Sequence, residues 1–216
     1  MNSIRNVIFD LDGTLVDSSD GVVESVNYSL RQVGAPEKRP ETIKPYIGYS
    51  LDKMYPAFTD APLIELIGHF RIRAAEIMVD LTTSLPGADE TLHALNSAGY
   101  RLAIATTKIQ QHLQGIISKF GWSEIIAVTV GADDVGREKP DPEAVYLALK
   151  RLDADPDSSV MVGDTINDVL AAKAAGLKVI AVASPFEHRD VVLAAGPDHL
   201  IGSIRDLPEL LDSPKP

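Results

Sequence analysis

The stretch VIFDLDGTLVDSS places two carboxylates, Asp10 and Asp12, directly after a short apolar run. Acids at the end of a buried strand lose hydration and repel each other unless a cation or a cationic side chain compensates them. On these residues alone two interpretations stay open. The segment is either an acidic turn in which Asp12 caps a helix, or part of a site that binds a cation.

Further polar residues stand at predicted strand ends or just ahead of predicted helices. They are two hydroxyls, two carboxylates and one ammonium: Thr106, Thr107, Asp164, Asp168 and Lys139. Each alone has an ordinary explanation as a cap or a solvated side chain. In a parallel sheet, however, the carboxyl ends of the strands meet at one edge, so we expect the set to converge with Asp10 and Asp12. Clustered carboxylates suit Mg²⁺, and Thr106 and Lys139 would then bind phosphate oxygens.

Composition excludes several other chemistries. The chain has 216 residues, a formal net charge of −11 and no cysteine, so neither disulfides nor thiolate catalysis apply. The five histidines show no ligand spacing, and we assign them no catalytic role. An acidic chain is a poor partner for nucleic acid, and no run has the length of a signal peptide or membrane span. We expect a cytoplasmic protein, monomeric or homodimeric, whose partner is a small phosphorylated metabolite.

Short apolar runs alternate with helical patterns along most of the chain. Six runs are typical of buried strands: Val7–Phe9, Leu102–Ala105, Ile125–Val130, Val160–Val162, Val179–Val182 and, more weakly, His199–Ile201. Four helices are predicted between them: Asp89–Ala98, Gln111–Phe120, Pro142–Leu152 and Ile166–Ala175. This alternation predicts an α/β fold with a doubly wound parallel sheet and helices on both faces.

The alternation is interrupted early in the chain. Between Asp17 and about Leu85 there is no convincing strand, and two amphipathic helices, Val22–Leu30 and Leu63–Ile77, stand out instead. We therefore predict a helical insertion. The core would comprise residues 1–16 and 83–216, and a helical cap domain residues 17–82.

Four segments together resemble a known family. DLDGTLVDS, ATT, KPDP and GDTINDVLAAKAAG, in this order from Asp10 to Gly176, resemble the signature motifs of the haloacid dehalogenase-like hydrolase superfamily. The insertion is similar to the α-helical cap of its phosphoglycolate phosphatase-like branch. The resemblance implies a Rossmann-like core, dependence on Mg²⁺ and an aspartyl-phosphate intermediate.

The resemblance also implies roles for individual residues. Asp10 corresponds to the nucleophile and Asp12 to the general acid/base, with Gly13 allowing the tight turn that brings backbone N–H groups to the phosphate. Mg²⁺ would be held by the Asp10 carboxylate, the Asp12 backbone carbonyl and Asp164, with Asp168 in support. The other expected site residues are Thr106, Thr107 and Lys139 for phosphate, and Gly48 in the substrate-specificity loop of the cap.

The sequence departs from the family pattern at two places. Thr107 stands where many phosphatases of this branch have Asn, and no arginine follows Gly48 as it does in sugar-phosphate mutases. We therefore expect a phosphatase that acts on a phosphoglycolate-like or sugar phosphate monoester. A β-phosphoglucomutase-like phosphomutase, a pyrophosphatase and a nucleotidase stay open as alternatives. Asp12 disfavours a dehalogenase or a phosphonatase, and the presence of Asp10 and Lys139 disfavours a non-catalytic binding module.

Overall fold

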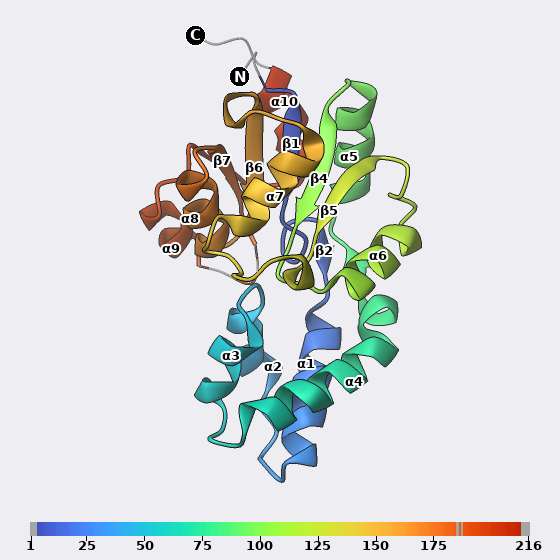
Figure 1. Cartoon of the computed structure of the whole chain (residues 1–216), viewed down its shortest axis with the longest axis vertical. Helices are drawn as coiled ribbons and strands as arrows, with labels where there is room; N and C mark the ends of the chain where they lie inside the picture. Colours follow the sequence, from blue (N-terminus) through green and yellow to red (C-terminus); the bar gives the residue numbers. More distant parts are fainter. Residues whose placement is uncertain (1–3, 185, 187, 213–216) are drawn as a thin grey trace.

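The core of the molecule is a six-stranded parallel sheet (Figure 1). The computed structural model describes residues 4–184, 186 and 188–212. The strands lie in the order β5-β4-β1-β6-β7-β8. Their bounds are β1 Asn6–Phe9, β4 Arg101–Ala105, β5 Ile126–Val130, β6 Ser159–Gly163, β7 Lys178–Val182 and β8 His199–Ile201. All six predicted strands are confirmed, and so is the parallel sheet that their unbroken apolar runs indicated.

Helices cover both faces of the sheet, as predicted for a doubly wound fold. Successive strand residues point to opposite faces, so Val7 and Phe9 join one apolar cluster and Ile8 joins the other. The first cluster packs under α5 Ala88–Ser97, α6 Gln110–Lys119 and α10 Leu207–Asp212, and the second under α7 Glu143–Leu152, α8 Ile166–Ala174 and α9 Arg189–Ala194. Within the described residues, no helix has the length and apolarity to cross a membrane.

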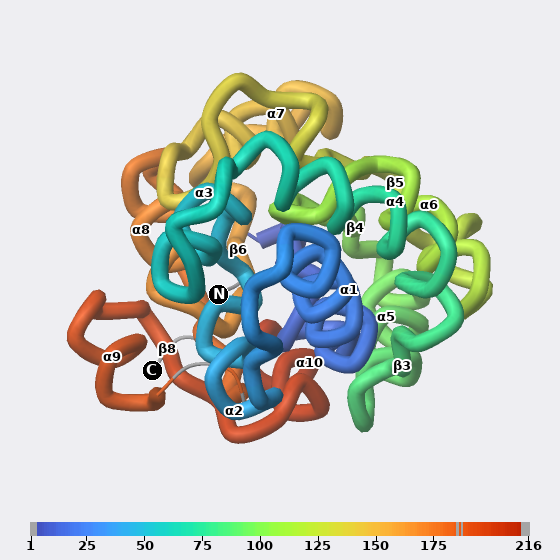
Figure 2. The backbone as a smooth tube through the Cα atoms, turned by 90° about the horizontal axis from the view of Figure 1, so that it is seen from below, coloured from blue at the N-terminus to red at the C-terminus, as the bar shows by residue number. Residues whose placement is uncertain are grey.

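A helical unit is inserted between β1 and β4. Two long helices, α1 Ser19–Gln32 and α4 Leu63–Leu81, pack side by side, and the short helices α2 Pro40–Ile43 and α3 Leu51–Met54 lie between them in the chain (Figures 1 and 2). The unit has an apolar cluster of its own, built on residues such as Val26, Leu30 and Leu66. Figure 1 shows it below the sheet, on the side where the strands end. The predicted helical insertion is therefore confirmed.

The two connections between this unit and the sheet pair with each other. β2 Val16–Asp17 and β3 Thr83–Ser84 form a two-residue antiparallel ribbon. The sequence analysis found no strand between Asp17 and Leu85, and this was wrong for β3. Two residues are too few to show a hydrophobic period, and only the pairing of segments far apart in sequence creates this strand.

Lys119, at the end of α6, ties the sheet domain to the end of α4. Its Nζ donates to the backbone carbonyl oxygens of Val79, Asp80 and Thr82 at 2.9, 2.9 and 2.7 Å. The last carbonyls of a helix have no partner within the helix, and a cation there also interacts favourably with the helix dipole. Lys119 thus satisfies the end of α4 and fixes it against α6.

We predict that Lys119→Met destabilises the fold by about 1 kcal/mol, because three carbonyls at an exposed helix end lose a charged donor. For a chain of this length that corresponds to a fall in Tm of about 2–4 °C. Thermal unfolding followed by circular dichroism measures it. Lys150→Met on α7 is the matched control, and an equal change in both variants would contradict the assigned role.

Candidate active site

The order of the strands brings the ends of β1 and β6 together. After β5 at one edge of the sheet, the chain returns to place β6 beside β1. Ligands of doubly wound sheets bind where the strand order reverses in this way. The backbone N–H of Asp10 donates to the carbonyl oxygen of Val162 at 2.8 Å, and that of Thr106 to Val130 at 3.0 Å. Both residues are therefore still held by the sheet although they lie just past β1 and β4.

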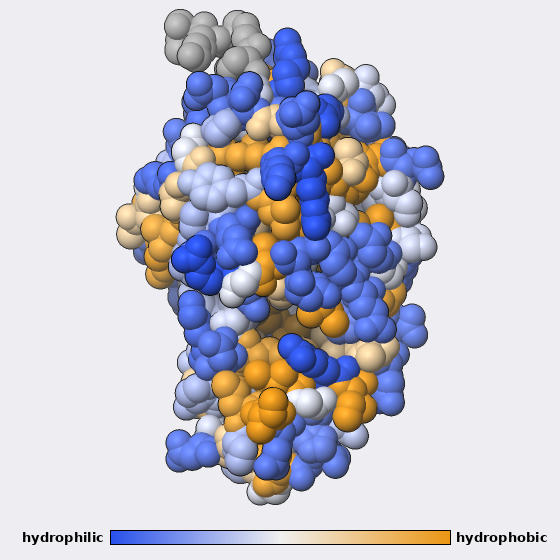
Figure 3. Space-filling view, viewed as in Figure 1, coloured by the Kyte–Doolittle hydropathy of each residue, from blue (hydrophilic) through white to orange (hydrophobic). Residues whose placement is uncertain are grey.

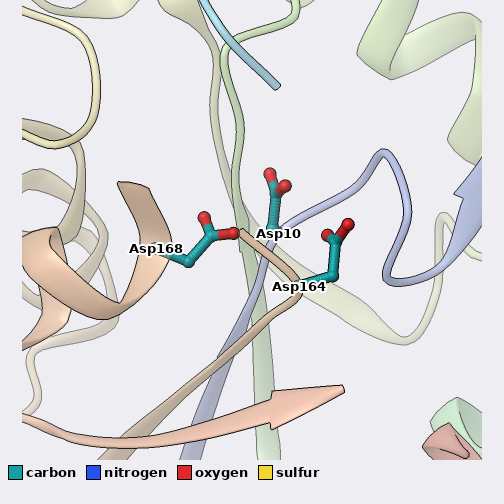
Figure 4. Close-up of side chains that lie close together, drawn as sticks. All are labelled: Asp10, Asp164 and Asp168. Carbon is teal, nitrogen blue, oxygen red and sulfur yellow. The ribbon is translucent and has the colours of Figure 1, made fainter. Parts of the chain in front are cut away.

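Three carboxylates converge at this reversal point (Figure 4). Asp10 follows β1, Asp164 follows β6, and Asp168 lies in the first turn of α8. One oxygen from each lies within 4.8 Å of the others. The exposed fractions of the three residues are only 2%, 1% and 0%. Such a concentration of buried negative charge is costly unless cations compensate it.

Lys139 supplies one compensating charge from the loop before α7. Its Nζ donates to Oδ1 of Asp10 at 2.7 Å and to Oδ1 of Asp168 at 2.6 Å. The other oxygen of Asp168 accepts from the backbone N–H and the hydroxyl of Thr165, at 2.9 and 2.8 Å. Asp168 is thus fully engaged in holding Lys139 and capping α8.

The pKa values show that one ammonium does not balance three acids. Burial, and secondly the neighbouring Asp168, raise the pKa of Asp10 to about 7 even though Lys139 lowers it. Burial raises the pKa of Asp164 well above its ordinary value, with Asp168 and Asp10 adding to the effect. Burial lowers the pKa of Lys139, but Asp10 and Asp168 outweigh it and raise the pKa above normal. The cluster has an affinity for additional positive charge.

Asp164 has the free ligand atom that a metal site requires. Its Oδ1 accepts from the Thr14 hydroxyl at 2.8 Å, whereas its buried Oδ2 has no hydrogen-bond partner in the described part of the chain. Oδ2 lies against Gly13, where an added Cβ would come within 2.1 Å of it and where φ is +84°. Only glycine fits this turn. Buried carboxylate oxygens with one orphaned acceptor fit a hard divalent cation.

Asp12 lies apart from this cluster and has different partners. Its Oδ1 accepts from the Ser18 hydroxyl, and its Oδ2 is 3.2 Å from Nζ of Lys108. Lys108 also donates to the Ser18 hydroxyl at 3.2 Å, and its side chain is only 7% exposed. The sequence analysis named neither Lys108 nor Ser18. The sequence signal that could have identified Lys108 as a site residue is its position two residues after Thr106.

A cavity of about 320 Å³ lies beside Asp12, between the helical unit and the sheet domain. Thr107, Lys108 and Gly48 line it, and so does His112, to which the sequence analysis gave no role. Gly48 occupies a tight turn with φ +90°, in which the backbone N–H of Tyr49 donates to the carbonyl of Tyr46 at 3.1 Å. The structure therefore separates the predicted residues into a carboxylate cluster with Lys139 and a neighbouring cavity.

The chain belongs to the haloacid dehalogenase-like hydrolase family, whose model matches residues 7–182. It is 34% identical over 204 residues to pyrophosphatase PpaX of Bacillus velezensis, with 94% of each chain covered. Among solved structures, it resembles a haloacid dehalogenase-like hydrolase from Bacteroides fragilis with a TM-score of 0.90 and 29% identity, covering 94% and 99% of the two chains. A "predicted phosphoglycolate phosphatase" from Haemophilus somnus 129PT gives a TM-score of 0.86 and 26% identity, covering 97% and 99%. The fold, the acid cluster and these relatives define a haloacid dehalogenase-like phosphatase with a helical insertion.

We predict that Asp164→Asn stabilises the metal-free protein by about 1 kcal/mol, or about 2–4 °C in Tm, because it removes one of three mutually repelling buried charges. The amide oxygen still accepts from Thr14. The same change should reduce the stabilisation gained on adding Mg²⁺, because it removes an anionic ligand.

Thermal unfolding in chelator and in Mg²⁺ measures both effects. Asp157→Asn, at an exposed carboxylate, is the matched control. A lower Tm for Asp164→Asn in chelator, or an undiminished response to Mg²⁺, would contradict a repulsive cluster that binds cations.

Proposed function

We propose that the chain is a Mg²⁺-dependent pyrophosphatase that works through an aspartyl-phosphate on Asp10. The observation that carries the reaction is the buried Asp10, held by Lys139 beside an oxygen of Asp164 that has no partner among the described residues. The observation that favours pyrophosphate as substrate is the 34% identity, over 94% of both chains, to a pyrophosphatase.

The proposed reaction has two steps. In the first, a carboxylate oxygen of Asp10 bonds to phosphorus, the bridging P–O bond breaks, and Asp12 gives its proton to the departing phosphate. In the second, water attacks the phosphorus of the aspartyl-phosphate, Asp12 takes a proton from that water, and the Asp10 carboxylate and a second phosphate are released. Asp12 is not part of the Asp10–Asp164–Asp168 cluster and lines the neighbouring cavity, which supports its assignment to the leaving-group side.

The other site residues act on charge and position in this proposal. Lys139 orients Asp10 and balances charge on the transferring phosphoryl group, and the Thr106 hydroxyl and backbone N–H groups near Gly13 hold its oxygens. Asp10, Asp164 and the backbone carbonyl of Asp12 would hold Mg²⁺. When bound, Mg²⁺ supplies neutralisation of the phosphoryl oxygens, usually a dominant contribution to this chemistry. Asp168 keeps Lys139 in place.

A second candidate substrate is phosphoglycolate or a sugar phosphate. The structural similarity to the "predicted phosphoglycolate phosphatase" favours it. Both candidates use the same phosphoryl-transfer residues and differ in the leaving group. In either case residues 17–82 would act as a cap that closes over the crevice and excludes water.

A phosphate-release screen tests the proposal. We expect pyrophosphate to give the highest kcat/KM among pyrophosphate, phosphoglycolate, hexose phosphates and nucleotides, with activity only in Mg²⁺. Asp10→Asn should reduce the rate by about 10⁴-fold or more, as expected for loss of a nucleophile, while the near-isosteric change preserves the fold.

Asp157→Asn serves as the control and should retain full activity. Preference for phosphoglycolate would overturn the substrate but not the chemistry. Formation of an isomeric hexose phosphate would indicate a mutase. Normal turnover by a folded Asp10→Asn protein would overturn the mechanism itself.

The turn at Gly48 allows a further prediction about substrate access. Gly48→Ala should reduce kcat/KM about 10-fold, because the new Cβ lies 3.2 Å from the side chain of Thr165, the residue before α8, so that either the loop or this side chain must shift. Gly34→Ala is the matched control. Gly34 also has a positive φ of +73° but has open space around it, so it carries the same kind of backbone strain without the contact.

Kinetics and thermal melts of both variants decide the case. If both lose similar stability and only Gly48→Ala loses activity, the loop acts on the substrate. If Gly48→Ala and Gly34→Ala have equal activity, Gly48 serves only the backbone turn and does not act on the substrate.

A further inference from the structure

The cavity beside Asp12 carries polar groups that the proposed reaction steps leave unused. The helical unit contributes Gly48, Phe70 and Arg71 to its wall, and the sheet domain contributes Lys108, His112 and Glu138. Figure 3 shows the recess at the waist of the molecule, where the two parts meet. A substrate bound with its phosphorus at Asp10 would extend its leaving group toward Asp12 and hence into this cavity.

His112 has a buried nitrogen with no assigned partner. The residue is 6% exposed, and among the described residues no group hydrogen-bonds its Nε2. A buried polar atom without a partner carries a desolvation penalty that a bound ligand can relieve. Burial, and secondly the ammonium of Lys108, hold the pKa of His112 down to about 4. The imidazole is therefore neutral near pH 7 and can offer one N–H donor next to Lys108.

Lys108 brings positive charge to the same wall. Its ammonium is buried, and an ammonium has three N–H donors. Two of these are directed to Asp12 and to Ser18, both at 3.2 Å. One donor is left for a group in the cavity. Glu138, which also lines the cavity, has a buried oxygen without a partner in the described residues. Burial, and secondly Asp52, raise the pKa of Glu138, although Lys53, Lys139 and Arg71 act in the opposite direction.

We propose that Lys108 and His112 recognise an anionic oxygen on the leaving group of the substrate. The unpaired acceptor of Glu138 receives an O–H of the same group. A departing hydrogen phosphate presents both an anionic oxygen and an O–H, and so does glycolate. This inference rests on the proposed function and deepens it. According to this inference, Lys108 and His112 of the sheet domain select substrates with a charged leaving group, and residues of the helical unit can contribute further selectivity.

Paired substrates separate this role from an effect through Asp12. Pyrophosphate has an anionic phosphate leaving group, whereas phenyl phosphate releases an uncharged phenol with a pKa of about 10. Phosphoglycolate and ethyl phosphate form a second pair that differs only in a carboxylate. A substitution that acts only by misplacing Asp12 should lower kcat/KM for substrates with uncharged leaving groups at least as strongly as for those with anionic ones. The reason is that uncharged leaving groups depend more on protonation by Asp12.

The decisive variants are His112→Leu, which removes the donor, and His112→Gln, which retains one. For His112→Leu we expect about a 10-fold fall in kcat/KM on pyrophosphate and on phosphoglycolate, corresponding to one hydrogen bond to a charged group. On phenyl and ethyl phosphate the change should stay within about twofold, and His112→Gln should recover part of the loss. Lys108→Met should lower all rates, and those for the anionic leaving groups most.

Binding provides a readout that does not depend on turnover. Calorimetry with imidodiphosphate, in which nitrogen replaces the bridging oxygen, should show about a 10-fold weaker Kd for His112→Leu and a smaller change for His112→Gln. Equal losses on paired substrates, or an unchanged Kd for imidodiphosphate, would overturn the inference. If phosphoglycolate is hydrolysed and pyrophosphate is not, the proposed pyrophosphatase activity fails, while the comparison with ethyl phosphate still tests Lys108 and His112.

Discussion

The burial of three carboxylates around one ammonium is the constraint on which the rest of this structure depends. Each buried ion costs several kcal/mol unless it is well compensated, and Lys139 can engage only Asp10 and Asp168. Oδ2 of Asp164, which has no hydrogen-bond partner among the described residues, is the group left uncompensated. Such a cluster persists only if a rigid frame holds the acids in place. The sheet provides that frame, because the hydrogen bond from Asp10 to Val162 extends the ladder to the acid itself.

The rest of the fold serves to make that frame rigid and to leave one end of it open. Apolar clusters on both faces of the sheet fix the strands, and the reversal of strand order at β1 creates a crevice at the ends of the strands. The helical unit packs mostly against its own side chains, and Phe186 of the sheet domain joins its apolar cluster. Its two connections are held by the β2–β3 ribbon and by Lys119.

Sequence patterns predicted those features that depend on local chemistry. The six strands were predictable because strands buried on both faces show unbroken apolar runs, and the convergence of Asp10, Asp164 and Asp168 followed from their positions after strands or in the next turn. Lys108 and His112 were missed because their importance arises from tertiary contacts. Nothing in ATTKIQQH shows that the ammonium of Lys108 turns toward Asp12, or that Nε2 of His112 is buried with no partner among the described residues. β3 was missed for the same reason, since its only partner, β2, lies far away in the sequence.

The loop after β4 links the two halves of the site. The hydroxyl of Thr106 accepts from the backbone N–H of Lys108 at 3.2 Å, and the carbonyl of Lys108 accepts from Ala132 at 3.0 Å. Lys108 is thereby anchored to the loops that follow two neighbouring strands, and its side chain reaches Asp12, in the turn after a third. A rigid ammonium at this point both orients Asp12 and lines the cavity. The segment that contains Lys108 would then fix both the proposed acid, Asp12, and the cation that recognises the charge of the leaving group, Lys108 itself. As a consequence, Asp12 would reach only a leaving group that is bound against Lys108.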